Sequence, residues 1–71
     1  MELSKRDKLA LIDQQDRQIS AAIYSQVINK RVGAKVMDDK LEKSATDELV
    51  RLEKIRDAIA VLRAEEEAKP E

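Results

Sequence analysis

The sequence predicts an all-α protein, an antiparallel two-helix hairpin that is completed by oligomerisation. Helix-forming residues fill two runs of about thirty residues each, and the only glycine, Gly33, lies almost midway between them. Aromatic residues make up 1% of the chain, so the core must be aliphatic, which suits helix packing better than a β-sandwich. With 71 residues, the chain is expected to be one helical domain, residues 1–71.

The first helix is expected over about residues 4–32. Ser4 suits the N-cap, with Asp7 at the third helical position, and no proline or glycine follows before Gly33. Aliphatic residues recur at the spacing of one buried helix face: Leu9, Ile12, Ile19, Ile23 and Val27. Asp16 interrupts this row. A second apolar row, which begins only in the later half of the helix, indicates a further neighbour: Ala21, Tyr24, Ile28 and Val32.

A bend is expected over residues 33–38. Lys30 and Arg31 precede it, and cations are favoured at a helix C-terminus by the helix dipole. Gly33 fits the C′ position, where a left-handed φ is common and costs glycine nothing. The first helix is therefore predicted to stop just before this glycine.

The second helix is expected over about residues 39–67, with a frayed acidic end. Asp38 and Asp39 suit its start, and Asp39 with Glu42 approximates a capping box. Six of seven consecutive heptad a and d positions are apolar, Glu48 being the exception: Leu41, Ala45, Leu52, Ile55, Ile59 and Leu62. This pattern predicts an amphipathic helix with coiled-coil-like packing.

An alternative segmentation stays open at this point. Ser44 or Thr46 would cap a shorter second helix, and a small β-hairpin within residues 32–43 would make the chain α+β. The favoured turn glycine is missing, and Lys-Leu-Glu-Lys has poor strand propensity, so the continuous helix is preferred.

The charges at the two ends of the chain favour an antiparallel arrangement. Lys5, Arg6 and Lys8 open the first helix and residues 65–67, all glutamate, close the second, each where the dipole prefers the opposite charge. Folding back brings the two clusters together, which selects the orientation of the helices.

Composition argues against catalysis and against a bound cofactor. Histidine and cysteine are absent, which removes the usual general base and the commonest metal ligands. Asp13 and Asp16 lie one turn apart, but no third ligand accompanies them, so a solvated helix face is preferred to a metal site. We expect no enzyme activity, no catalytic residue, no metal and no cofactor.

Charge and hydropathy restrict the partners. Fourteen basic residues nearly balance fifteen acidic ones, and a net charge of −1 gives no bulk attraction to nucleic acid. No apolar run approaches the ~20 residues that span a bilayer, so we expect no membrane partner and a cytoplasmic or virion-associated protein.

The candidate site is an apolar interface. Two helices bury one thin seam, so the surplus apolar side chains call for a second copy or a larger protein assembly. The candidate interface residues are Tyr24, Ile28, Val32, Val50 and Val61. Lys30, Arg31 and Lys35 concentrate positive charge at the bend and are candidate phosphate contacts, although no aromatic platform accompanies them.

Two resemblances add to this interpretation. Three segments resemble the layout of gpW-type phage head-to-tail joining proteins, which have a helix, a short hairpin bearing basic residues and a helix opened by a Ser/Thr cap. These segments are Asn29-Lys30-Arg31-Val32, residues 44–49 (Ser-Ala-Thr-Asp-Glu-Leu) and Arg63-Ala64-Glu65. That resemblance implies a ring-forming structural protein of a virion neck. Two equal helices about a central bend are also similar to Rop-type RNA-binding hairpins, which implies an alternative regulatory role.

Overall fold

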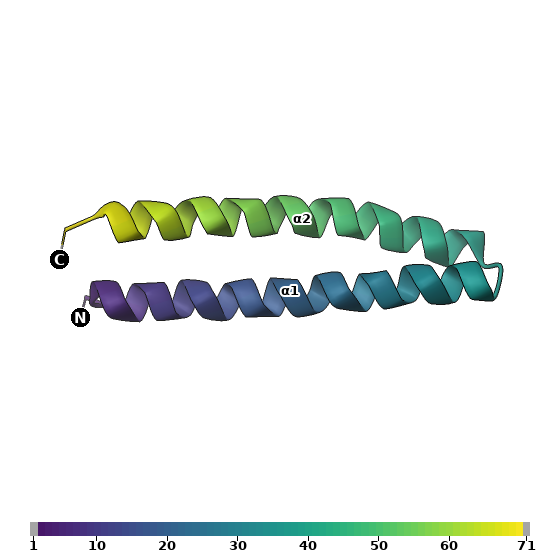
Figure 1. Ribbon diagram of the computed structural model, residues 1–71, viewed down its shortest axis with the longest axis horizontal. Coiled ribbons are helices and arrows are strands. Elements are labelled where there is room, and N and C mark those ends of the chain that lie inside the picture. Colours follow the sequence, from purple (N-terminus) through teal and green to yellow (C-terminus); the bar gives the residue numbers. More distant parts are fainter. Residues whose placement is uncertain (1, 71) are drawn as a thin grey trace.

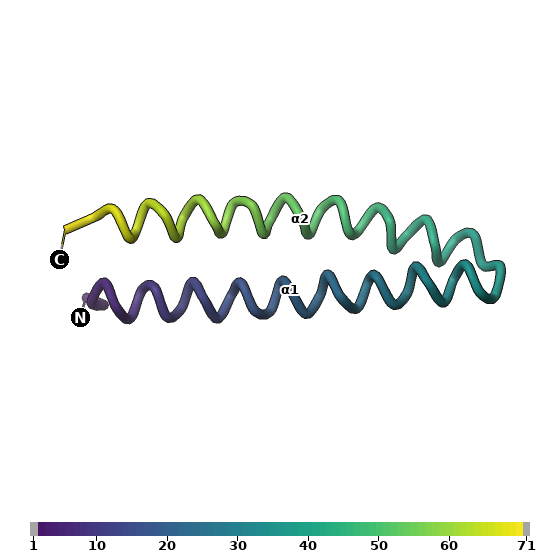
Figure 2. Tube along the Cα trace, in the orientation of Figure 1, coloured from purple at the N-terminus to yellow at the C-terminus, as the bar shows by residue number. Residues whose placement is uncertain are grey.

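The computed structural model describes residues 2–70 and consists of two long α-helices folded back on one another (Figure 1). Helix α1 spans Lys5–Lys35 and helix α2 spans Asp39–Ala68. Together they form a rod of 53 × 16 × 15 Å, with both chain ends at one end and the turn at the other (Figure 2). The predicted all-α helical hairpin is confirmed; residues 1 and 71 of the predicted domain lie outside the described residues.

Both helices begin at side-chain caps of the predicted kind, but the predicted capping box of Asp39 with Glu42 was wrong, because Asp38 is the cap of α2 and Asp39 is its first residue. The hydroxyl of Ser4 accepts a hydrogen bond from the backbone N–H of Asp7 at 3.1 Å. The carboxylate of Asp38 accepts one from the N–H of Leu41, also at 3.1 Å. Each cap satisfies one N–H that has no partner inside its helix. The carboxylates of Asp7 and Asp38 also interact favourably with the positive N-terminal end of the helix dipole.

The predicted role of Gly33 at the end of α1 was wrong. The helix continues to Lys35, Gly33 lies inside it, and no glycine has a positive φ. Met37 takes the left-handed conformation instead, with φ of 58°. The N–H of Asp38 bonds to the carbonyl of Gly33 at 2.8 Å and that of Met37 to Ala34 at 3.4 Å, the pair of bonds of a Schellman motif.

The alternative with a β-hairpin within residues 32–43 was also wrong. Residues 32–35 belong to α1 and residues 39–43 to α2, and residues 2–70 contain no strand. The Asp38 cap starts α2 immediately after the turn, so only three residues remain between the helices.

The two helices meet along a narrow seam. Gly33, Ala45 and Leu52 are buried, and the other seam residues are half-buried, among them Ile12, Ile19, Ile23, Ile55 and Ile59. Asp16 and Gln26 are half-buried in the same α1 row. The core is therefore thin and aliphatic, with polar interruptions.

Leu62, predicted for the seam, lies at its edge: its side chain is 54% exposed, while Arg63 is half-buried. At about 100° per residue, Leu62 lies ten residues after the buried Leu52 and about 80° around the helix from it. Arg63 lies eleven residues after Leu52 and only about 20° around the helix from it. Arg63 therefore faces α1 more directly than Leu62 does.

Candidate interaction surface

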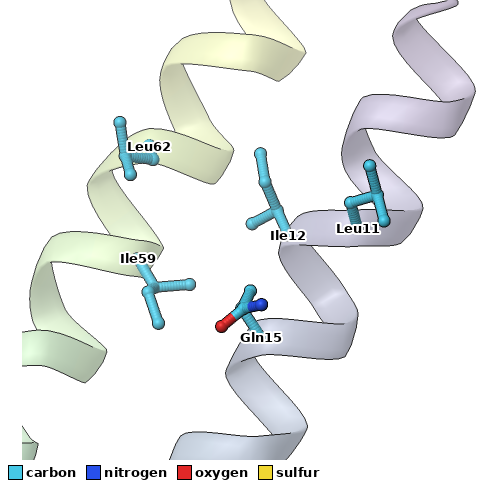
Figure 3. A pocket seen from close by; sticks show the side chains of 5 residues that line it. All are labelled: Leu11, Ile12, Gln15, Ile59 and Leu62. Atoms are coloured by element: carbon cyan, nitrogen blue, oxygen red, sulfur yellow. The ribbon is translucent and has the colours of Figure 1, made fainter. Parts of the chain in front are cut away.

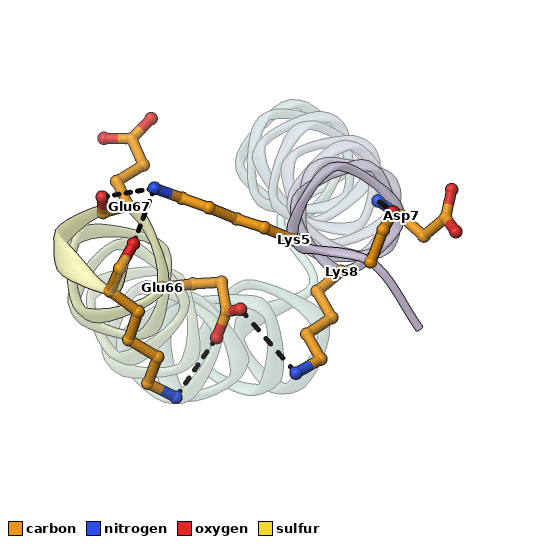
Figure 4. Close-up of polar contacts among 7 residues, drawn as sticks. Lys5, Asp7, Lys8, Glu66 and Glu67 are labelled. Carbon is orange, nitrogen blue, oxygen red and sulfur yellow. Dashed lines mark hydrogen bonds and ion pairs between the residues drawn. The ribbon is translucent and has the colours of Figure 1, made fainter. Parts of the chain in front are cut away.

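At the open end of the hairpin, where both chain ends lie, hydrogen bonds and ion pairs join the two helices (Figure 4). Lys5 donates through Nζ to the carbonyl oxygens of Glu67 and Lys69, each at 2.8 Å, and so caps the C-terminus of α2. The Glu66 carboxylate lies 3.9 Å from the ammonium of Lys8 and 3.2 Å from that of Lys69. The expectation that the terminal clusters meet is confirmed.

A second cross-helix ion pair joins Asp13 to Arg63. Arg63 donates through Nε to Oδ1 of Asp13 at 2.7 Å and also pairs with Glu67. The hydrogen bond from Arg63 lowers the pKa of Asp13 below its usual range, assisted by the positive charge of that guanidinium. Sequence reasoning missed this pair, because it depends on the register between the helices.

Glu48, the exception in the predicted heptad pattern, is half-buried beside the seam. Arg51, one turn later on α2, forms an ion pair with it. The hydrogen bond that Arg51 donates to the Glu48 carboxylate lowers the pKa of Glu48 below its usual range and keeps the carboxylate charged. The negative charge of Glu48 beside the seam is thus balanced by Arg51, a residue of the same helix.

An apolar hollow of about 160 Å³ interrupts the seam near the open end (Figure 3). It is lined by Leu11, Ile12, Gln15, Ile59 and Leu62. Its volume is below the ~300 Å³ at which ordinary ligand pockets begin, and Gln15 is its one polar lining residue. The hollow therefore has the character of imperfect packing between two helices and lacks the converging polar groups of a ligand site.

Residues 2–70 contain no group of three His, Cys, Asp or Glu side chains that could together hold a metal ion. Asp13 is engaged by Arg63, and Asp16 is half-buried along the seam. No helix within the described range is long and apolar enough to cross a membrane.

The five predicted interface residues are all exposed, at 67, 46, 43, 51 and 57% for Tyr24, Ile28, Val32, Val50 and Val61. They do not form one surface. Val50 lies two residues before the buried Leu52, a turn of about 200°, so it points away from α1. Tyr24 lies five residues after Ile19 in the seam, about 140° around α1, and so points away from α2.

The two outer faces differ in their charge. On α2, the residues between Val50 and Val61 include Glu53, Lys54 and Asp57, all exposed. On α1, residues 18–29 (Gln-Ile-Ser-Ala-Ala-Ile-Tyr-Ser-Gln-Val-Ile-Asn) carry no charged side chain. Six of these twelve positions are exposed: Gln18, Ser20, Ala21, Tyr24, Ser25 and Ile28. We call residues 18–29 the uncharged stretch; its freedom from charge, visible in the sequence, is the signal that sequence reasoning missed.

The candidate phosphate contacts lie at the closed end of the rod. Lys30, Arg31 and Lys35 are exposed in the last turns of α1. Asp38 and Asp39 follow across the turn and reduce the positive charge there. The cations are accessible, but the negative charge of these two aspartates lowers the attraction of this end of the rod for a phosphate group.

Comparison with known proteins gives no match: no protein-family model fits the chain, and no curated protein or solved structure resembles it significantly.

Proposed function

We propose that this chain is a non-enzymatic structural or adaptor protein that assembles with other protein surfaces through its exposed apolar helix faces. The observation that carries the proposal is its accessible surface of 5766 Å². A compact protein of 8.1 kDa exposes about 4,500 Å². The excess of about 1,300 Å² is larger than the ~800 Å² that each partner contributes to a standard protein interface.

The shape of the hairpin explains this excess. Its radius of gyration is 16.2 Å, whereas a compact chain of this length has about 11 Å. Among the described residues, Ala45 and Leu52 are the buried apolar side chains, while ten large apolar residues are exposed. Ordering each residue costs about 1.5 kcal/mol, so such a thin core supports the idea that a partner surface completes the fold.

The biological setting is part of the proposal. The resemblance to gpW-type joining proteins suggests a component of a virion head-to-tail junction. It rests on the sequence of residues 29–32, 44–49 and 63–65, since a helical turn stands where that layout has a short hairpin. An exposed apolar surface on a small rod fits the repeated contacts of such an assembly.

A regulatory hairpin that binds RNA is a second candidate, favoured by the exposed cations at the closed end. Lys30, Arg31 and Lys35 could contact phosphates. The net charge of −1 weighs against this candidate. So does the aromatic content, because Tyr24 is the one aromatic residue on which a base could stack.

The test is the molecular mass in solution at micromolar concentration, measured by sedimentation equilibrium alongside circular dichroism. We expect a helical species heavier than 8.1 kDa, either an oligomer or a complex with a co-purifying protein. A cooperatively folded monomer of constant mass would contradict the proposal. Association with RNA that weakens steeply with salt would favour the second candidate.

A further inference from the structure

We infer that the hairpin opens from its free ends, and that ion contacts between the two helices control this opening. We call residues 5–16 and 55–68 the open half of the hairpin, and residues 19–52 its turn half. The inference goes beyond the proposed function, because it concerns a movement of the chain itself and needs no partner. It rests on two differences between the halves, in apolar burial and in ion contacts.

The apolar contacts are concentrated in the turn half. The buried residues of the described chain, Gly33, Ala45 and Leu52, all lie there. In the open half the seam side chains are at most half-buried, and the hollow of about 160 Å³ takes the place of contacts that close packing would supply (Figure 3). Segments with few buried apolar contacts have low local stability. The open half is therefore the part of the hairpin that separates first.

The ion contacts between the helices have the opposite distribution. Within residues 2–70, every side-chain hydrogen bond or ion pair that links the two arms of the hairpin joins residues 5–13 to residues 63–69 (Figure 4). The contacts are those of Lys5 with the backbone of Glu67 and Lys69, of Lys8 with Glu66, and of Arg63 with Asp13. The closure of the open half therefore depends on charge, whereas that of the turn half depends on packing.

These ion contacts are accessible to dissolved salt. The side chains of Asp13 and Arg63 are 41% and 42% exposed, and that of Lys8 is 47% exposed. Exposed charges are screened as the ionic strength rises, since the Debye length falls from about 10 Å at 0.1 M to about 3 Å at 1 M. Screening does not act on apolar burial, which is non-directional and uncharged. Salt should therefore separate the open half and leave the turn half packed.

Opening changes the surface that the chain presents. Leu9, Ile12 and Ile59 are half-buried in the open half and become exposed when its two helical segments separate. Ala45 and Leu52 stay covered, because they lie in the turn half. Ionic strength thus selects between a closed rod and a rod with an apolar, open end.

Amide hydrogen exchange measured by NMR tests this opening residue by residue. We expect a change from about 0.05 M to about 0.5 M sodium chloride to speed exchange more than about fivefold at Ile12 and Ile59, after correction for the effect of salt on an unfolded peptide. The same change should alter exchange at Ile23 and Leu52, in the turn half, by less than about twofold. A rise of equal size in both halves, or no rise at Ile12 and Ile59, would overturn the inference.

Two matched variants separate the ion contacts from other effects of salt. Glu66→Gln removes the carboxylate that lies between Lys8 and Lys69, and Glu53→Gln removes an exposed carboxylate of α2 that takes no part in the contacts between the arms. Exchange is read at Ile12, on the opposite helix, where a change local to α2 has no effect. At about 0.05 M salt, Glu66→Gln should speed it more than about threefold and Glu53→Gln less than about 1.5-fold. Equal effects of the two variants would also overturn the inference.

The outcomes are independent of the proposed assembly, which the molecular mass in solution reports. A folded monomer whose open half separates in salt overturns the assembly and supports the opening. An assembled chain in which salt leaves exchange at Ile12 and Ile59 unchanged supports the assembly and overturns the opening.

Discussion

Gly33 in α1 lies directly against the backbone of Glu42 in α2. A Cβ atom at position 33 would stand 2.8 Å from the amide nitrogen of Glu42 and 3.2 Å from the carbonyl oxygen of Asp38. Both neighbours are backbone atoms, which cannot rotate aside as the end of a side chain can. The absence of a side chain at Gly33 therefore allows the two helices to meet closely at the turn.

Replacing Gly33 by alanine should destabilise the hairpin. Alanine is favoured over glycine inside a helix by about 1 kcal/mol, but the forced displacement of α2 should outweigh this gain. We expect Gly33→Ala to lower the free energy of unfolding by about 1–3 kcal/mol in urea denaturation. Gln14→Ala, at an exposed position of α1, serves as the control and should change stability by only a few tenths. A gain in stability for Gly33→Ala would contradict the close approach.

Local signals predict the start of each helix, and tertiary contacts decide the rest of the turn. The caps at Ser4 and Asp38 follow from residue types and short spacings, and both are confirmed. The importance of Gly33 is also visible in the sequence, but its reason is not. The predicted left-handed φ is a local property, whereas the observed contact with Glu42 depends on how the helices pack.

The candidate surface was predictable in part. Exposure of Tyr24 and Val50 follows from their distance from the apolar row of each helix. Their opposite directions depend on which face of each helix enters the seam. The Asp13–Arg63 pair depends on the register between α1 and α2, which single-helix periodicity does not contain.

Truncating the seam should cost far more than truncating the outer face. Leu52 is 5% exposed, and deleting a buried branch of this size costs about 2–5 kcal/mol. We expect Leu52→Ala to lose stability in this range in urea denaturation. Val61→Ala, on the outer face, should change it by less than about 0.5 kcal/mol. Equal losses at the two positions would show that the faces of α2 are wrongly assigned.

The Asp13–Arg63 pair should make stability depend on pH in the acid range. Because Arg63 lowers the pKa of Asp13 in the folded chain, the unfolded chain takes up a proton first as the pH falls. The contribution of the pair is therefore complete above the usual titration range of aspartate and is lost as the pH falls through the lowered pKa. Titration of the Asp13 carboxyl by NMR should show this pKa rising in Arg63→Gln.

The control for this titration is Arg51→Gln. It breaks the ion pair with Glu48 and leaves Arg63 in place, so the pKa of Asp13 should keep its wild-type value. An equal pKa for Asp13 in wild type and in Arg63→Gln would show that the two side chains are not paired in solution.

Glycine should have opposite effects at Met37 and Asp39, two residues apart across the turn. Met37 has a left-handed φ of 58°, which strains a residue with a side chain and does not strain glycine. Its side chain is 87% exposed, so little packing is lost, and Met37→Gly should raise the free energy of unfolding by about 1 kcal/mol. Asp39 is the first residue of α2, where glycine removes both a favourable carboxylate and helix propensity. Asp39→Gly should therefore lower stability or leave it unchanged, as urea denaturation at equal chain concentration would show. Stabilisation by Asp39→Gly with none by Met37→Gly would mean that the chain turns at residue 39, as a β-hairpin there would require.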